Sequence, residues 1–399
     1  MRKYLLTLLL LLPLALSAQH RHIPQYGFAR LERNRIQYPS GKSPEFDGFL
    51  RKMDTLVTFG AGDVRILHIG GSHVQAGTWT QQLRRNLMSL RYGLDGGRGL
   101  VFPYAAAGTN TPVGYTTHAT GEWTMTRNLR PDPYHPLGLT GLSATTADTA
   151  ATFTIELTER NAREASPRFS FRTVDIFGRG DAFPVIYMDR DTVEGTFDGW
   201  KYHFDLPHYT ESVLVGFSGF PGSFTVTGVY LDRPANGLTV SECGVNGAST
   251  RSWLDCADLA RDLAFVRPDL VIFSIGINDI QGNDFDTDRF IRNYDKLVSL
   301  VRSVNPRCAI LFTSNNDSYR NHVPNLHSSA VEMAFARLAV MRDAAFWDLF
   351  DMMGGSGSAA AWEAAGLMQP DKIHFTPAGY DLLGDLLFNA LADAARQRR

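Results

Sequence analysis

The sequence predicts an α/β domain, built around a parallel sheet, that is interrupted by an inserted β-sandwich domain. In residues 43–108 and 237–399, short apolar runs of strand length alternate with segments of helical apolar spacing. In residues 109–236, short runs alternate apolar with polar residues, and Gly, Pro, Asp and Asn separate them. Strands that alternate with helices indicate a parallel sheet covered on both faces, whereas closely spaced alternating strands indicate a sandwich. A chain of 399 residues has room for two such domains.

The α/β part is expected to begin with a helix, a buried strand and a second helix. These elements are predicted at 43–59, 65–69 and 78–92. After the insert, further strands and helices alternate up to a last helix at 376–397, for which Thr376 is the expected N-cap and Pro377 the first position. The strands expected there lie at 238–241, 269–275, 308–313 and 345–350, and the helices at 286–304 and 328–342.

The insert is expected to contain strands at 153–157, 169–171, 185–188, 200–204, 213–217 and 224–229. Several of its aromatic residues are candidates for stacking on sugar rings, although their period-two spacing favours a place in the sandwich core. These residues are Trp123, Tyr134, Tyr187, Trp200, Tyr202 and Tyr209.

The N-terminus is typical of an export signal. Arg2 and Lys3 precede the apolar run 4–16, and the small residues Ser17 and Ala18 follow it. We therefore expect residues 1–18 to be a signal peptide that is cleaved near Ala18, and the mature protein to be periplasmic or extracellular. The apolar run is short for a transmembrane span, and no later segment is long enough for one.

Charge and cysteine content exclude some functions. The formal net charge is −2, so no basic surface indicates nucleic-acid binding. Three cysteines, Cys243, Cys256 and Cys308, allow at most one disulfide and have no metal-ligand spacing. We expect three buried or half-buried thiols and no metal site.

The first motif that carries chemistry is a glycine turn followed by a serine. Gly70, Gly71 and Ser72 lie between a predicted strand and a predicted helix. A serine on such a turn presents its hydroxyl at the carboxyl end of the sheet, where open α/β sheets bind ligands. The backbone N–H groups of the following helix suit a developing oxyanion. Taken alone, the motif is more typical of a structural turn.

Three more motifs follow along the chain. Gly247 lies in a turn after a predicted strand and can offer a backbone N–H to an oxyanion. Asn278 ends the most apolar strand, where its side-chain amide can donate into a cleft. Asp371 and His374 precede the last helix at a spacing that lets the carboxylate hold the imidazole. Each motif alone is also compatible with an ordinary turn.

In the order Ser, Gly, Asn and Asp-x-x-His, these motifs resemble those of the SGNH hydrolase superfamily, also called GDSL-like esterases. The resemblance covers residues 43–108 and 237–399, and it implies a flavodoxin-like three-layer sandwich. It also implies that Ser72 is the nucleophile and that Asp371 and His374 are its acid–base partners. The oxyanion hole would consist of the Ser72 backbone, Gly247 and the Asn278 side chain.

One residue departs from the family pattern. The first motif usually reads Gly-Asp-Ser, and here Gly71 stands in place of the Asp. That Asp mainly shapes the turn, so the assignment of Ser72 is kept, whereas the geometry and rate of the site are left open.

The position of the insert is similar to that in the Ape-type peptidoglycan O-acetylesterases, where the insert looks like a carbohydrate-binding module. Residues 72–77 and 244–248 also resemble that branch. The resemblance implies a secreted serine esterase that removes O-acetyl groups from peptidoglycan or another polysaccharide, without a metal or organic cofactor. His73, next to the nucleophile, is a candidate substrate contact.

Three other functions remain open. A lipid or arylester acylhydrolase would need an apolar acyl groove, and a glycan O-acetyltransferase would use the same triad. A non-catalytic glycan-binding protein would have lost activity along with the usual Asp at Gly71. The joint presence of Ser72, Asn278, Asp371 and His374 argues against this last function.

Overall fold

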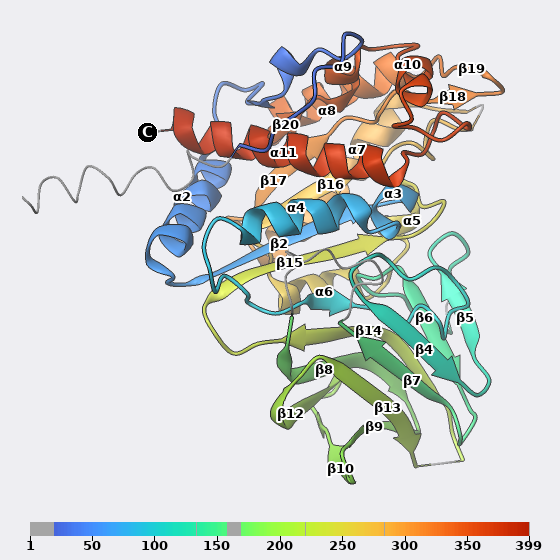
Figure 1. Ribbon diagram of the computed structural model, residues 1–399. Coiled ribbons are helices and arrows are strands. Elements are labelled where there is room, and N and C mark those ends of the chain that lie inside the picture. Colours follow the sequence, from blue (N-terminus) through green and yellow to red (C-terminus); the bar gives the residue numbers. More distant parts are fainter. Residues whose placement is uncertain (1–19, 133, 158–168, 220, 283, 399) are drawn as a thin grey trace, which may run out of the picture.

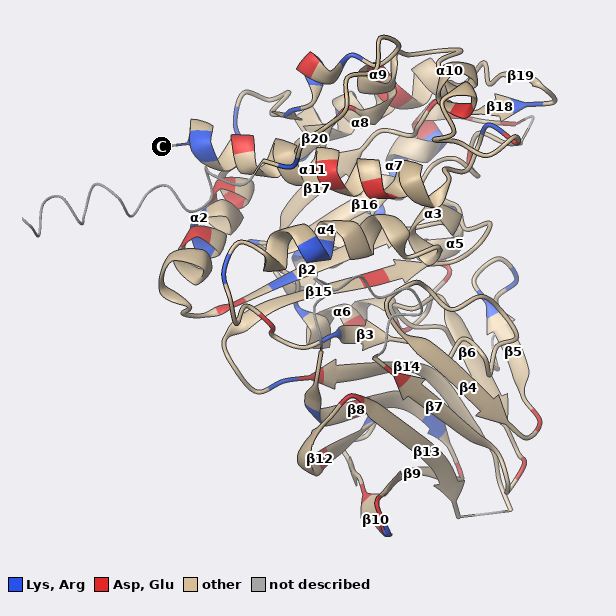
Figure 2. Ribbon diagram, viewed as in Figure 1, with Lys and Arg blue, Asp and Glu red and all other residues tan. Residues whose placement is uncertain are grey.

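The computed structural model describes residues 20–132, 134–157, 169–219, 221–282 and 284–398. The predicted signal peptide, 1–18, lies outside the described residues. Figure 1 shows a layered α/β part and, below it, a part made almost entirely of strands. This arrangement confirms the predicted fold class. Acidic and basic residues are interspersed along both parts (Figure 2).

The central sheet has six strands in the order β1-β20-β17-β16-β2-β15. All neighbouring pairs are parallel except β1 with β20. Numbered along the chain, the five parallel strands follow the order 2-1-3-4-5, which is that of flavodoxin-like sheets. The strands are β1 (Ile36–Gln37), β2 (Asp63–Gly70), β15 (Gly237–Gly244), β16 (Leu270–Ser274), β17 (Ala309–Thr313) and β20 (Ala345–Trp347).

Helices cover both faces of this sheet, because alternate residues of each strand point to opposite sides. On β2, Ile66 belongs to the core shared with α2, α4 and α11, whereas Leu67 belongs to the core shared with α6, α7 and α8. The helices are η2 (Leu31–Arg33), α2 (Pro44–Phe59), α3 (Ser72–Gln75), α4 (Thr78–Met88), α5 (Thr250–Leu254), α6 (Leu259–Val266), α7 (Thr287–Val304), α8 (Ser328–Met341), α9 (Leu349–Met353), α10 (Ala359–Ala364) and α11 (Pro377–Gln397). A small hairpin, β18 (Tyr319–Arg320) with β19 (Val323–Pro324), precedes α8.

Most predicted elements overlap the observed ones, and two need correction. The strand expected at 169–171 shares only Phe171 with β8, which continues to Gly180 because residues 171–180 pair with β12 and β14. The apolar run 345–350 is not a single strand, since β20 ends at Trp347 and α9 begins at Leu349. Asp348 causes the break because its side chain accepts a hydrogen bond from the N–H of Asp351 and caps α9. At the last helix, Thr376 caps α11 as predicted.

The second part consists of two antiparallel sheets that pack face to face. Phe217 on β13 and Phe224 on β14 meet across the interface, with their ring centroids 5.4 Å apart. One sheet has the order β10-β9-β13-β7-β4 and the other β11-β12-β8-β14-β6-β5, and β3 also pairs with β14. The strands are β3 (Gly99–Val101), β4 (Thr116–Thr120), β5 (Thr124–Arg127), β6 (Leu142–Thr146), β7 (Thr152–Glu156), β8 (Phe171–Gly180), β9 (Phe183–Met188), β10 (Asp191–Glu194), β11 (Thr196–Phe197), β12 (Lys201–Thr210), β13 (Ser212–Ser218) and β14 (Phe224–Asp232).

A buried ion cluster lies where the two parts meet. Glu242 on β15 accepts hydrogen bonds from Arg84 of α4 and from Arg98, which directly precedes β3. Burial acts to raise the pKa of Glu242, but the two guanidinium groups outweigh it and hold the pKa below its usual value. The carboxylate therefore stays charged and ties α4 and the start of β3 to the central sheet. Cys243, Cys256 and Cys308 are buried free thiols, as expected.

Candidate active site

Two glycines let the turn that carries Ser72 pack closely, and the first of them has no room for a side chain. A side chain at Gly70 would overlap Val74 and lie 3.0 Å from the carbonyl oxygen of Ser274. At Gly71, an added Cβ would lie 3.3 Å from Asn278 Nδ2 and 3.5 Å from the carbonyl oxygen of Ala248. The chain can therefore turn sharply after β2 and begin α3 at Ser72, at the carboxyl end of the sheet.

The loop before α11 brings a histidine and an aspartate to this serine. Ser72 Oγ lies 2.9 Å from His374 Nε2, and His374 Nδ1 lies 2.7 Å from Asp371 Oδ2. A carboxylate can only accept at Nδ1, so Nδ1 carries the proton and Nε2 is free to accept from the serine hydroxyl. The three residues predicted from their motifs thus form one hydrogen-bonded chain, although Ser72 and His374 are 302 positions apart.

Asp371 is held in its ionised form. Partial burial acts to raise its pKa, but hydrogen bonds from the His374 ring and from the N–H groups of His374 and Ile373 lower the pKa below its usual value. The same two backbone bonds fix the carboxylate in the turn. Its position and charge suit a group that orients an imidazole and stabilises the imidazolium.

The other two predicted motifs converge on the same turn. Asn278, which follows β16, donates from Nδ2 to the carbonyl oxygen of Ala248 at 2.9 Å. Gly247, which follows β15, has a φ of +87°, a conformation that favours glycine. Because Asn278 and Ala248 both lie against Gly71, the loops after β2, β15 and β16 meet beside Ser72.

A polar network that the sequence did not predict joins these loops. Gln75, which is buried in α3, accepts from the N–H of Asn246 at 2.6 Å and donates to the side chain of Asn110 at 3.1 Å. Asn246 also donates to the side chain of Asn110 at 2.8 Å. The network fixes the residue before Gly247 relative to the Ser72 helix. Gln75 and Asn246 lie within the sequence motifs around Ser72 and Gly247. Their place in those motifs is the feature of the sequence that could have identified them.

Asp279, the residue after Asn278, is hydrogen-bonded to the start of α5. Its carboxylate accepts from the backbone N–H of Thr250 at 3.1 Å and from the Thr250 hydroxyl at 2.6 Å. Burial raises the pKa of Asp279 to about 6, and the hydrogen bonds from Thr250 oppose that rise. The contact links the loop after β16 to the start of α5, and it therefore holds the backbone at Asn278 in place.

His73 lies on the buried side of the site. Its side chain is 7% exposed, its Nδ1 is 2.9 Å from the Tyr380 hydroxyl, and its ring lies 5.2 Å from that of His374. Burial, followed by the proximity of His374, lowers the pKa of His73 to about 3, so the ring is neutral. This location gives the ring little surface for a substrate, and a substrate contact by His73 stays a prediction.

Comparison with known proteins identifies a domain within the chain. Residues 215–382 match the GDSL-like Lipase/Acylhydrolase family. The chain carries a GDSL-like acylhydrolase domain. The matched range includes Gly247, Asn278, Asp371 and His374, whereas Ser72 precedes it. This acylhydrolase is therefore a carboxylic ester hydrolase of SGNH type. A comparison with curated protein sequences finds no match.

A solved structure shows the same fold over most of this chain. A peptidoglycan O-acetylesterase superposes on the acylhydrolase with a TM-score of 0.74 at 23% identity, covering 91% of this chain and 99% of that one. A family two carbohydrate esterase from Cellvibrio japonicus has a TM-score of 0.29 at 12% identity, covering 71% and 98% of the two chains. A GDSL-like lipase from Bacteroides thetaiotaomicron has a TM-score of 0.31 at 18% identity, covering 39% and 76%.

Within the residues that the structure describes, no helix combines the length and the apolar character needed to cross a bilayer.

Proposed function

We propose that the acylhydrolase is an exported esterase that removes O-acetyl groups from a glycan, with Ser72 as nucleophile, His374 as general base and Asp371 as its partner. The observation that carries this proposal is the continuous hydrogen-bonded chain from Asp371 through His374 to Ser72. The spacing of both contacts is that of a nucleophile activated by an oriented base.

In the first half of the reaction, His374 Nε2 takes the proton of Ser72 Oγ as the oxygen attacks the acetyl carbonyl. The negative charge that develops on the carbonyl oxygen is stabilised by the N–H groups of Ser72 and Gly247 and by the Asn278 amide. Asp371 stabilises the imidazolium formed on His374. The tetrahedral intermediate then collapses, and His374 gives its proton to the departing sugar oxygen.

In the second half, water releases the acetyl group from Ser72. His374 takes a proton from the water, which attacks the acetyl-enzyme, and returns that proton to Ser72 Oγ as acetate leaves. These steps use only side chains and backbone groups of this chain.

Two observations support a glycan substrate. The acetylesterase that shares the fold over 91% of this chain acts, by its description, on peptidoglycan. The side chains of His374 and Asp371 are 39% and 45% exposed, so an acetyl group on a polymer can reach Ser72 without the polymer entering a deep pocket. Export is supported by the signal-like residues 1–18.

Acetate release from a panel of esters tests the proposal. We expect the purified protein to release acetate from O-acetylated peptidoglycan or O-acetylated xylan, and to hydrolyse acetyl arylesters faster than octanoyl arylesters. A preference for the octanoyl esters with no acetate from any glycan would support a lipid or arylester acylhydrolase instead. Transfer of acetyl to an added glycan in excess of hydrolysis would identify a transferase.

The Ser72→Ala variant is the matched control in this assay. We expect it to lose nearly all acetate release while its Tm stays within about 2 °C of the wild type, because Ser72 is at the surface of the turn and half-buried. Wild-type turnover by purified Ser72→Ala would refute the assignment of the nucleophile.

A further inference from the structure

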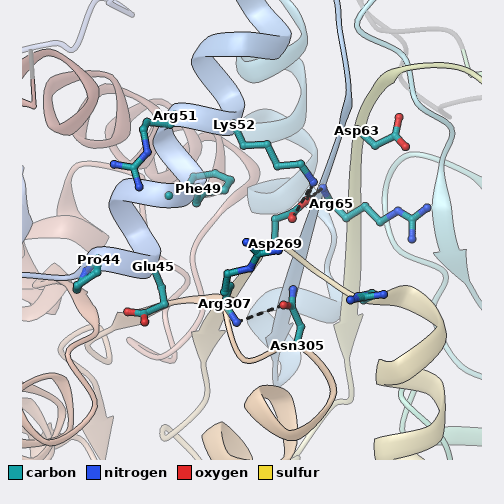
Figure 3. A pocket seen from close by; sticks show the side chains of 12 residues that line it. Pro44, Glu45, Phe49, Arg51, Lys52, Asp63, Arg65, Asp269, Asn305 and Arg307 are labelled. Carbon is teal, nitrogen blue, oxygen red and sulfur yellow. Dashed lines mark hydrogen bonds and ion pairs between the residues drawn. The ribbon is translucent and has the colours of Figure 1, made fainter.

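A cavity of about 670 Å³ lies at the edge of the central sheet opposite to Ser72 (Figure 3). Its walls come from α2, from the start of β2 and from the segments that precede β16 and β17, so it opens at the amino ends of the parallel strands. Ser72 follows the carboxyl end of β2, eight residues further on, which is roughly 25 Å away. The cavity therefore cannot hold the acetyl group that Ser72 attacks.

Cationic side chains predominate in this cavity. Its lining includes Arg51, Lys52, Arg65, Arg267 and Arg307, against only three carboxylates. This local excess of positive charge contrasts with the net charge of −2 of the whole chain. The cavity therefore favours an anion over a neutral ligand of the same size.

Most of these cations have no carboxylate partner. Lys52 pairs with Asp269 at 2.8 Å, and the Arg65 guanidinium donates to the carbonyl oxygen of Val266 at 3.3 Å. In the described part of the chain, Arg51, Arg267 and Arg307 form no ion pair, and their side chains are exposed. A guanidinium group that has no carboxylate partner offers two parallel N–H donors, and these match the spacing of carboxylate or phosphate oxygens.

The cavity continues toward the strand-rich part. A neighbouring hollow of about 340 Å³ shares Asp63 and Arg65 with it, and a third of about 390 Å³ shares Arg65. Both hollows also contain Asp232, and in the third the carboxylate of Asp175 lies 2.7 Å from Lys201 Nζ and 2.9 Å from His203 Nδ1. Arg65 is thus common to all three. A single small anion would fill only the first cavity, whereas a chain of linked sugars that places its anionic groups there could extend into the other two hollows.

We propose that this groove, centred on Arg51, Arg65 and Arg307, is a second binding site for the anionic groups of a glycan polymer. The inference rests on the proposed function, since the polymer is the one from which Ser72 removes acetyl groups. The anionic groups are carboxylates of attached peptides or phosphodiesters of an attached polymer. Binding at this distance from Ser72 holds the polymer and leaves the acetyl-transfer chemistry unchanged.

A binding experiment on the full chain tests the groove. Arg51→Gln with Arg307→Gln is compared with Arg190→Gln with Arg292→Gln, which removes two exposed arginines outside the groove. All proteins carry Ser72→Ala, so binding is scored without turnover. The probes are peptidoglycan freed of phosphate polymers, isolated poly(glycerol phosphate) and neutral O-acetylated xylan, each titrated at low and high salt.

We expect the variant with Arg51→Gln and Arg307→Gln, the groove pair, to bind at least one anionic probe about tenfold more weakly than the parent protein. This difference should be smaller at high salt. The control pair should bind within about twofold of the parent, and xylan binding should not change between variants. The affected probe identifies carboxylates or phosphodiesters as the source. Unchanged affinity of the groove pair for both anionic probes, or an equal loss in the control pair, would overturn the proposal. Failure of the proposed function would instead appear as no acetate release from any glycan by the wild type.

Discussion

The side-chain amide of Asn278 is oriented by the backbone of a neighbouring loop. One of its two N–H bonds is donated to Ala248, 2.9 Å away, so the direction of the other is fixed as well. Gly71 leaves room for this amide, because an added Cβ would lie 3.3 Å from Asn278 Nδ2. A donor held in this way can stabilise an oxyanion without reorganising during the reaction. The departure from Gly-Asp-Ser is therefore compatible with the proposed site.

Asn278→Ala should lower kcat for an acetyl arylester by about 10²–10³ and change KM little, because the donor acts mainly in the transition state. Steady-state kinetics on the purified variant measure both constants. Asn236→Ala is a suitable control, since Asn236 is exposed and precedes β15, at the end of the sheet opposite to Ser72. A rise in KM with kcat unchanged would show that Asn278 binds the ground state.

The residues of the candidate site differ in how far the sequence reveals them. Asp371 and His374 interact at a spacing of three, so a local motif is enough to predict their contact. The contact of Gln75 with Asn110 spans 35 positions and depends on how the chain enters the strand-rich part. The burial of His73 depends on Tyr380, 307 positions away, and adjacency to Ser72 gives no indication of it.

At the level of elements, the ends of α8 and α9 create a carboxyl pair. Burial, and then the carboxylate of Asp348, raise the pKa of Glu332 to about 7 from its ordinary 4.5. Asp348 is kept there because it caps α9 and accepts from Ser314. The folded state therefore holds a proton on Glu332 that the unfolded chain has already released above pH 4.5.

Because the pKa of Glu332 is raised on folding, the free energy of unfolding should fall as the pH rises from about 4.5 to about 7. Glu332→Gln removes this dependence. We expect the variant and the wild type to be equally stable at pH 4, and the variant to be more stable by about 1 kcal/mol at pH 8, a value reduced because the carboxyl is only half-buried. Urea denaturation at both pH values measures the difference. A constant difference at the two pH values, or the same gain from the exposed Glu122→Gln, would contradict this prediction.

In the whole molecule, the strand-rich part contacts the loops of the candidate site. Leu129, which follows β5, lies against Gly247, since a Cβ added there would be 2.7 Å from Leu129 Cδ2. The aromatic candidates for sugar stacking divide into two groups. Trp123, Trp200 and Tyr202 pack on the sandwich core, whereas Tyr134, Tyr187 and Tyr209 are exposed. Their alternating pattern predicted strands but could not identify the exposed members, because each strand has two faces and only packing determines which one is covered.

Tyr134 is 87% exposed and only five residues beyond Leu129, so of the three exposed candidates it lies closest along the chain to the contact with Gly247. Tyr134→Ala should lower kcat/KM on O-acetylated polysaccharide about fivefold to tenfold and leave small acetyl arylesters unchanged, because remote contacts help only large substrates. Tyr92→Ala, a fully exposed tyrosine of the α/β part, is the control. Equal losses on both substrates would mean that this loop shapes the catalytic site itself, and no loss on either would leave Tyr134 without a role in binding.

The nucleophilic role of Ser72 is tested most directly by trapping it. After treatment with an activated sulfonyl fluoride, peptide mass spectrometry should find one adduct, on Ser72, formed at the same rate at which activity on an acetyl arylester is lost. His374→Ala should slow this labelling by at least about 10³-fold, because the hydroxyl loses its base. Labelling of a different residue in step with inactivation, or labelling of Ser72 at the same rate without His374, would contradict the proposed mechanism.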